Sequence, residues 1–177
     1  MSENPSLWVQ RFTALIKTGG TVLDLACGRG RHSLLLAECG FRVEALDRDA
    51  AALAAIADRA PGIVTRQAEL EGDAWPYRGR VFDAIVVTNY LHRPLLPDIL
   101  DALADDGVLI YETFMLGNER FGKPSNPAFL LRPGELLDLV RDRLTPVAFE
   151  QGEVQAPRPA VMQRLCATRR SKFSLPA

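Results

Sequence analysis

One stretch, residues 21–32, most constrains what this chain can fold into. Its first five residues are mostly apolar and suit a short buried strand. Gly28 and Gly30 then interrupt the strand, and residues 33–39 predict a helix. A strand, a glycine turn and a helix form half of a βαβ unit, in which the free amides at the helix start favour an anionic group. The stretch therefore predicts a nucleotide-type site.

Two carboxylates indicate the class of ligand but do not identify the ligand. Asp24 lies inside the first strand, and Asp47 ends the next expected strand, residues 41–47. A carboxylate at the end of that second strand can accept hydrogen bonds from both ribose hydroxyls, which NAD and S-adenosylmethionine (SAM) sites need alike. The dinucleotide fingerprint G-x-G-x-x-G requires glycine where this chain has Ser33. Asp47 therefore supports a nucleoside, and Ser33 counts against a dinucleotide.

The rest of the chain alternates between strand and helix patterns. We expect helices over residues 6–17, 50–60, 95–103 and 133–140, and strands over 63–68, 82–88, 107–112, 144–150 and 161–168. This alternation predicts an α/β fold with a doubly wound, mostly parallel sheet. Ligands of such sheets bind beyond the carboxyl ends of the strands. Asp24, Asp47, Glu69, the segment 89–92 and Glu112 all fall at those ends, which predicts one shared site.

Two further segments could cover that site. Residues 113–132 have no clear periodicity, and long connections of this kind are commonly lids or binding loops. Within them, Asn118 and Arg120 could recognise a polar acceptor, or could belong to a solvated loop tip. The apolar stripe of the N-terminal helix predicts packing on the core, with the alternative that Trp8 covers the cofactor site.

Four motifs together resemble the class I SAM-dependent methyltransferases over nearly the whole chain: Asp24-Leu-Ala-Cys-Gly-Arg-Gly30, the acid at 47, residues 68–70, and Phe82-Asp-Ala-Ile85. The resemblance implies a single Rossmann-like domain over residues 1–177. It also implies a seven-stranded sheet whose last two strands form an antiparallel hairpin. The narrower run 28–33, followed by Leu-Leu-Leu-Ala, is similar to small bacterial tellurite-resistance-type and related small-molecule methyltransferases.

The resemblance also implies a set of cofactor contacts. Arg31, at the helix start, would pair with the carboxylate of SAM, and Glu69 would accept the adenine amino group. The full set for SAM is Asp24, Ala26, Gly28, Gly30, Arg31, Asp47, Arg48, Ala68, Glu69, Leu70 and Asn89.

The turn after the fourth strand bears on the acceptor. Class I enzymes that methylate adenine or glutamine amides carry Asp/Asn-Pro-Pro-Tyr/Phe there, whereas this chain has Asn89-Tyr-Leu-His92. Nucleic acid and amide acceptors are therefore disfavoured, and a small molecule is expected. If that acceptor loses a proton, His92, Tyr90 and Glu112 are best placed to act, because histidine suits general-base work near neutral pH. Tyr90 and His92 would also contact the acceptor; a purely structural role for His92 in the turn is equally open.

Composition sets the remaining expectations. The net charge of −1 shows no polyanion-binding footprint. Three cysteines without a C-x-x-C pair predict neither a disulfide framework nor a zinc site, and the two histidines lie in different segments. Residues 1–5 carry no signal-peptide pattern and no apolar run could cross a membrane, so we expect a cytoplasmic protein. We also expect it to hold no metal and to be a monomer or a homodimer. Two other classes stay open: an NAD(P)-dependent oxidoreductase, although the chain lacks a Tyr-x-x-x-Lys pair, and a non-catalytic SAM-binding or interaction protein.

Overall fold

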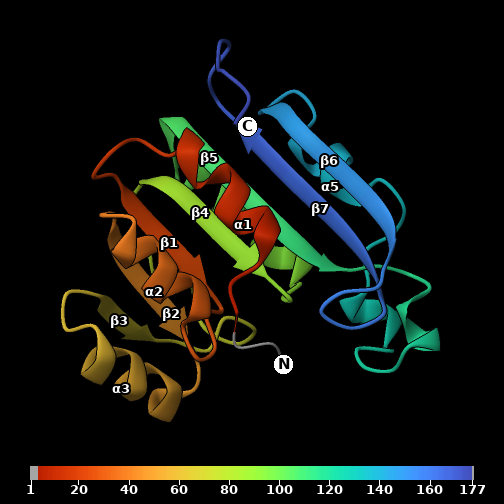
Figure 1. Cartoon of the computed structure of the whole chain (residues 1–177), viewed down its shortest axis with the longest axis horizontal. Helices are drawn as coiled ribbons and strands as arrows, with labels where there is room; N and C mark the ends of the chain where they lie inside the picture. Colours follow the sequence, from red (N-terminus) through yellow and green to blue (C-terminus); the bar gives the residue numbers. More distant parts are fainter. Residues whose placement is uncertain (1–3, 177) are drawn as a thin grey trace.

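The computed structural model describes residues 4–176, which form a seven-stranded sheet in the order β3-β2-β1-β4-β5-β7-β6 (Figure 1). The strands are β1 (Thr21–Leu25), β2 (Arg42–Asp47), β3 (Val64–Gln67), β4 (Phe82–Thr88), β5 (Leu103–Phe114), β6 (Thr145–Val154) and β7 (Ala160–Thr168). Strands β1 to β5 are parallel, and β7 runs antiparallel to both β5 and β6. The predicted parallel sheet with a C-terminal antiparallel hairpin is confirmed.

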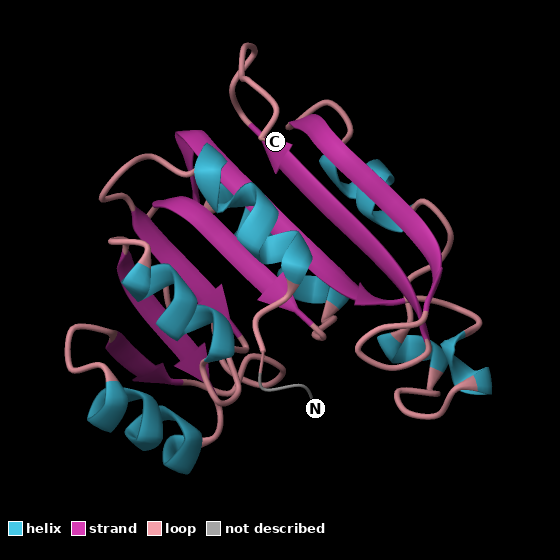
Figure 2. Ribbon diagram, viewed as in Figure 1, coloured by secondary structure: helices cyan, strands magenta, loops and turns pink. Residues whose placement is uncertain are grey.

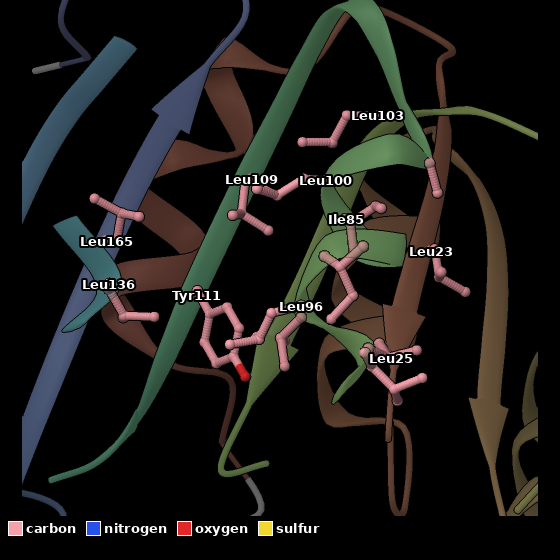
Figure 3. Close-up of a cluster of buried hydrophobic side chains, with 14 of the residues drawn as sticks. Leu23, Leu25, Ile85, Leu96, Leu100, Leu103, Leu109, Tyr111, Leu136 and Leu165 are labelled. Atoms are coloured by element: carbon pink, nitrogen blue, oxygen red, sulfur yellow. The ribbon is translucent and has the colours of Figure 1, made fainter. Parts of the chain in front are cut away.

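Helices cover both faces of the sheet (Figures 1 and 2). On one face lie α1 (Leu7–Phe12), α2 (Arg31–Glu38) and α3 (Ala50–Arg59), and on the other lie α4 (Leu96–Asp101) and α5 (Glu135–Val140). Successive strand residues point to opposite faces, so an apolar strand supplies both cores. In β4, Val86 packs on the α1 face, whereas Ile85 packs with Leu100 of α4 on the other. Figure 3 shows this second core, where Leu136 of α5 also meets the sheet.

Several element boundaries differ from the predicted ones. The N-terminal helix ends at Phe12 and continues as a single 3₁₀ turn, η1 (Thr13–Leu15), where residues 6–17 were predicted helical. β5 begins at Leu103, four residues early, and α4 ends at Asp101. A register shift in the β4–β5 pairing between Phe82 and Ala84 accommodates the polar residues at the start of β5.

The position of Trp8 decides between the two roles predicted for it. Its side chain is 5% exposed, and its indole Nε1–H donates to the main-chain oxygen of Leu165 in β7 at 3.3 Å. The ring of Phe12 lies edge-on against it, with centroids 4.8 Å apart. Trp8 therefore packs on the core of the β7 side and does not cover the cofactor edge. No helix within residues 4–176 is long and apolar enough to cross a membrane.

Candidate active site

The glycine turn between β1 and α2 has three residues in the left-handed region: Ala26 at φ 54°, Gly28 at φ 55° and Gly30 at φ 75°. A Cβ atom added to Gly30 would lie 2.5 Å from Cγ1 of Ile56, so close packing of α3 requires glycine there. A Cβ at Gly28 would meet nothing within 4 Å. Gly28 therefore faces open space, as a turn that receives a ligand must. Ala26 holds a conformation that costs a non-glycine residue about 1–3 kcal/mol, and such strain is concentrated at functional sites.

Asp47, at the end of β2, is hydrogen-bonded to this turn. Its Oδ2 accepts from the Gly28 N–H at 2.7 Å, and its Oδ1 accepts from the Asp49 N–H at 3.0 Å. A carboxylate oxygen has two lone-pair sites, so each oxygen keeps one acceptor position. The side chain is partly exposed at the strand end. Asp47 thus fixes the turn and still has acceptor capacity for a ligand.

Asp24 and Ser33 form a buried pair beneath the turn. The Ser33 hydroxyl donates to Oδ2 of Asp24 at 2.5 Å, and both residues are at most 1% exposed. Oδ1 of Asp24 has no hydrogen-bond partner within residues 4–176. Burial raises the pKa of Asp24 to about 6, although the Ser33 hydrogen bonds and the charge of Arg31 oppose the rise. Ser33, which stands where the dinucleotide fingerprint has glycine, therefore positions the carboxyl group of Asp24. Oδ1 of that group remains available as a hydrogen-bond acceptor.

The start of α2 is covered by the N-terminal segment. Arg31 Nη1 donates to the main-chain oxygen of Asn4 at 3.2 Å, and His32 Nε2 accepts from the Ser6 N–H at 3.0 Å. The other ring nitrogen of His32 therefore carries the proton and donates to the Thr88 hydroxyl at 3.3 Å. Burial lowers the pKa of His32 to about 3, with a further contribution from Arg31. The ring is neutral near pH 7 and serves as a structural link between this segment and β4.

The segment after β3 lies against the end of β2. The Ala68 N–H donates to the main-chain oxygen of Asp47 at 3.1 Å, and Arg48 Nη1 lies 3.8 Å from Oε2 of Glu69. The Leu70 side chain is buried in the core, so it is not available to a ligand. The structure thus brings the predicted cofactor residues of β1, β2 and β3 to one edge of the sheet.

A cavity of about 540 Å³ adjoins this edge. It lies among the ends of β4 and β5, the predicted lid and the loop between β6 and β7. Its lining comes from residues 89–91, 113–114, 123–126 and 129, with Glu71 and Arg158. Asn89, a predicted cofactor contact, has φ 55° and lies in this lining. Asn89 therefore lies where the cavity meets the edge of the sheet that carries the predicted cofactor residues.

Of the three predicted catalytic residues, Tyr90 alone lines the cavity. Its hydroxyl is buried and has no hydrogen-bond partner among the described residues, whereas its main-chain oxygen accepts from the Tyr111 hydroxyl at 2.9 Å. Burial raises the pKa of Tyr90, and the carboxylates of Glu71 and Glu69 raise it further. The phenol stays protonated near pH 7, so it can donate a hydrogen bond but is a poor base.

His92 and Glu112 lie outside the lining. Glu112 is 4% exposed, and its Oε2 lies 3.2 Å from Arg164 Nε on the adjacent strand β7. It lies on the same face of β5 as Val108 and Ile110, which pack on the α1 side of the sheet. His92 follows β4, is half-buried, and its ring makes no hydrogen bond to the described residues. The ion pair therefore accounts for Glu112, whereas the ring of His92 has no structural partner.

Neither of the two polar lid residues predicted to bind the acceptor lines the cavity. The Asn118 amide donates to the main-chain oxygen of Pro124 at 2.9 Å and accepts from the Val161 N–H at 3.1 Å, and the residue is 2% exposed. Arg120 Nη2 lies 2.5 Å from Oε1 of Glu153, on β6. Both side chains hold the lid to the C-terminal hairpin, which gives them a structural role instead of the predicted one.

Arg93 is a key residue that the sequence did not reveal. Its guanidinium forms a bidentate ion pair with Glu135: Nε donates to Oε1 at 2.6 Å, and Nη2 donates to Oε2 at 2.9 Å. The same group donates to the main-chain oxygens of Ala128 and Leu130, each at 2.8 Å. It thereby ties the end of the lid to the turn after β4. The only available signal was its place beside the segment 89–92, because Glu135 is far along the chain.

Comparison with known proteins gives a partial match to one family model and several matches to one fold. The family described as "Methyltransferase domain" matches residues 22–107. TehB of Haemophilus influenzae is similar with a TM-score of 0.75 and 19% identity, over 92% of this chain and 61% of TehB. This chain therefore spans less than two thirds of TehB. A comparison with curated proteins gives no match.

Two further solved structures share the fold. A TehB-like SAM-dependent methyltransferase of Corynebacterium glutamicum has a TM-score of 0.67 and 20% identity, over 92% of this chain and 87% of its own. Geranyl diphosphate C-methyltransferase of Streptomyces coelicolor A3(2), in complex with S-adenosylhomocysteine, has a TM-score of 0.66 and 18% identity, over 92% and 79%.

Proposed function

We propose that this chain, a class I SAM-dependent methyltransferase by family and fold, transfers the methyl group of SAM to a small molecule held in the cavity beside Tyr90. The observation that carries the proposal is the cavity itself. Its volume of about 540 Å³ lies within the range of about 300–1,000 Å³ for small-molecule sites, and it adjoins the edge that carries Asp24 and Asp47. The geranyl diphosphate enzyme, which shares the fold, takes its name from a small-molecule acceptor.

The residues at the edge of the sheet fit SAM. The open turn at Gly28 would receive its methionine and ribose portion, and Asp47 would accept from the ribose hydroxyls. The free Oδ1 of Asp24 offers a buried acceptor beside the turn. Ala68 and Glu69 would flank the adenine. Bound SAM supplies a methyl group activated by its sulfonium.

The chain's own part is to orient the acceptor and to exclude water. Holding two reactants in line can supply roughly 7–11 kcal/mol in favourable cases. The Tyr90 hydroxyl, buried and without a partner, would donate a hydrogen bond to the acceptor. If the acceptor loses a proton, His92 would take it from the border of the cavity. His92 does not line the cavity, but it is next in the chain to the lining residue Leu91, and its ring makes no hydrogen bond to the described residues.

We further infer a cytoplasmic setting and no nucleic-acid partner. The net charge is −1, and a protein that binds a polyanion normally shows a basic patch. Cys27, Cys39 and Cys166 are all free thiols, as in a reducing compartment.

The test measures which fraction of a cell extract receives the labelled methyl group of SAM. The purified protein is incubated with SAM labelled in its methyl group and an extract of the source cells. We expect the label in compounds below about 1 kDa, and a preponderance in precipitable protein or nucleic acid would contradict the small-molecule acceptor. Once the product is known, Tyr90→Phe and His92→Ala should lower turnover and leave the affinity for S-adenosylhomocysteine nearly unchanged. A large loss of that affinity would mean that these residues act on the fold or the cofactor.

A further inference from the structure

We propose that the acceptor is an anionic amphiphile: an apolar body that carries a carboxylate or a phosphate, which Lys123 and Arg158 bind at the end of the cavity away from Tyr90. The inference rests on the proposed function and names the class of its substrate.

The first observation is two cations without anionic partners. Lys123 belongs to the lid and Arg158 to the loop between β6 and β7, and both line the cavity. Neither has a carboxylate within 4 Å among the described residues. Other arginines of this region are paired: Arg93 with Glu135 and Arg120 with Glu153. Two unpaired cations in one cavity offer an anion the charge-assisted hydrogen bonds that the other arginines already make within the protein.

The second observation is that distant segments converge. Figure 1 shows the loop between β6 and β7 beside the lid, although the two are far apart in the sequence. The Arg158 guanidinium carbon lies 5.8 Å from the centre of the Phe114 ring, at the end of β5. Arg158 is exposed, and this contact places its cation beside the cavity wall.

The third observation is the apolar part of the cavity lining, which we call the apolar wall. Leu91, Phe114, Pro124 and Phe129 all line the cavity. Phe129 is 44% exposed, so its ring is still accessible to a bound molecule. A small inorganic oxyanion would leave this wall uncovered, so the cavity fits an organic anion better.

Glu71 gives the acceptor a direction. It also lines the cavity, but it follows the segment 68–70 and lies close enough to Tyr90 to raise the pKa of that phenol. The negative charge therefore lies on the cofactor side, and the positive charges lie on the lid and hairpin side. An anionic acceptor would be repelled from Glu71 and attracted to Lys123 and Arg158, which turns its uncharged, reacting end toward Tyr90.

Matched probes test this on the full-length protein saturated with S-adenosylhomocysteine. The probes are 2-naphthoate, 2-naphthyl phosphate and the neutral 2-naphthamide, with binding measured by calorimetry and ligand-observed NMR. We expect at least one anion to bind about fivefold or more tightly than the amide, since each exposed ion pair contributes roughly 0.2–1 kcal/mol. The tighter of the two anions identifies the acceptor group as carboxylate or phosphate.

Charge variants locate the effect. The double variant Lys123→Gln/Arg158→Gln should lose the preference for the anion and keep its affinity for the amide. The control Arg170→Gln/Lys172→Gln removes the same charge from the C-terminal tail, at the opposite end of β7, and should keep the preference. Unchanged affinity for S-adenosylhomocysteine in each variant checks that it folds.

Three results would overturn the inference: equal affinity for anion and amide, a preference that survives in the cavity double variant, or no binding of any probe. Each of these leaves the methyltransferase assignment intact as long as S-adenosylhomocysteine binds. Failure of the wild-type protein to bind S-adenosylhomocysteine would contradict the proposed function instead.

Discussion

The proposed site has two halves: a cofactor half at the ends of β1, β2 and β3, with Asp24, Gly28 and Asp47, and an acceptor half at the cavity beside Tyr90. The two halves are held together in different ways. The cofactor half is fixed by short bonds between neighbouring strands and turns: Gly28 to Asp47, Ala68 to Asp47, and Ser33 to Asp24. The acceptor half draws on segments far apart in the sequence, and long side chains such as Arg93 link them.

This difference separates what is constrained from what can vary. In the cofactor half, backbone geometry and the hydrogen-bonded carboxylates of Asp24 and Asp47 leave little freedom to change a residue. In the acceptor half, the cavity is shaped by lid and loop residues that could change without disturbing the sheet. A fold shared at 18–20% identity is consistent with this division, because the turn and strand ends can persist while the lining differs.

The largest expected effect concerns Asp24 and the pH dependence of stability. Its pKa is raised from the usual 3.8 to about 6, so in the cofactor-free protein the unfolded chain releases this proton at lower pH than the folded chain. The contribution of Asp24 to the free energy of unfolding therefore falls as the pH rises from about 4 to about 6, by about 3 kcal/mol, and stays level above that. Asp24→Asn should lack this fall. Urea denaturation of both proteins between pH 4 and 7 measures it, and parallel profiles would contradict a buried acid with a raised pKa.

The next effect separates the two glycines of the cofactor half. Gly30→Ala should lower the free energy of unfolding by about 2 kcal/mol more than Gly28→Ala, because both alanines carry left-handed strain but only the first also overlaps Ile56. Urea denaturation gives both values. For SAM binding we expect the reverse order. Gly28→Ala should lower the affinity for SAM more than Gly30→Ala, because its added methyl group projects into the open side of the turn. Equal loss of stability in the two variants would show that the contact with α3 is not what selects glycine at position 30.

A smaller effect is expected in the acceptor half. Arg93→Ala should cost about 1–2 kcal/mol of stability, since it leaves the largely buried Glu135 with a weaker partner and frees two lid carbonyls, while the arginine itself is one-third exposed. The affinity for S-adenosylhomocysteine should stay within about twofold. Arg120→Ala, which breaks the exposed pair with Glu153, is the matched control and should cost less than about 1 kcal/mol. If Arg93→Ala weakened cofactor binding strongly, the two halves would not be independent.

The same division decided what the sequence could predict. The strand, turn and helix around Gly28 depend on residues close in sequence, and a doubly wound, mostly parallel sheet follows from alternating strands and helices, so both were predicted. The C-terminal antiparallel hairpin was implied by the family resemblance. The early start of β5 was missed because Asp105, Asp106 and Gly107 favour turns. In the structure Leu103 pairs with Phe82 of β4, and these three residues lie in the irregular stretch before regular pairing resumes at Val108.

Side-chain roles in the acceptor half were harder to predict. Asn118 and Arg120 looked like recognition residues because they are polar and lie in a lid, but their bonding partners are on the hairpin strands β6 and β7. Arg93 and Arg158 carry no local motif, and only the folded chain shows what they contact. The position of Tyr90 in the cavity lining could be predicted because Tyr90 comes two residues after the end of β4.

The central claim is that the edge around Gly28 and Asp47 binds SAM, and calorimetric titration with SAM and S-adenosylhomocysteine, with NAD and NADP as controls, tests it most directly. We expect micromolar binding of the SAM pair alone, and a more than tenfold loss in Asp47→Ala, which removes the acceptor for the ribose hydroxyls. The control Asp49→Ala removes a neighbouring carboxylate that caps α3 and should leave the affinity nearly unchanged. Binding of NAD, or near-normal SAM affinity in Asp47→Ala, would contradict the account.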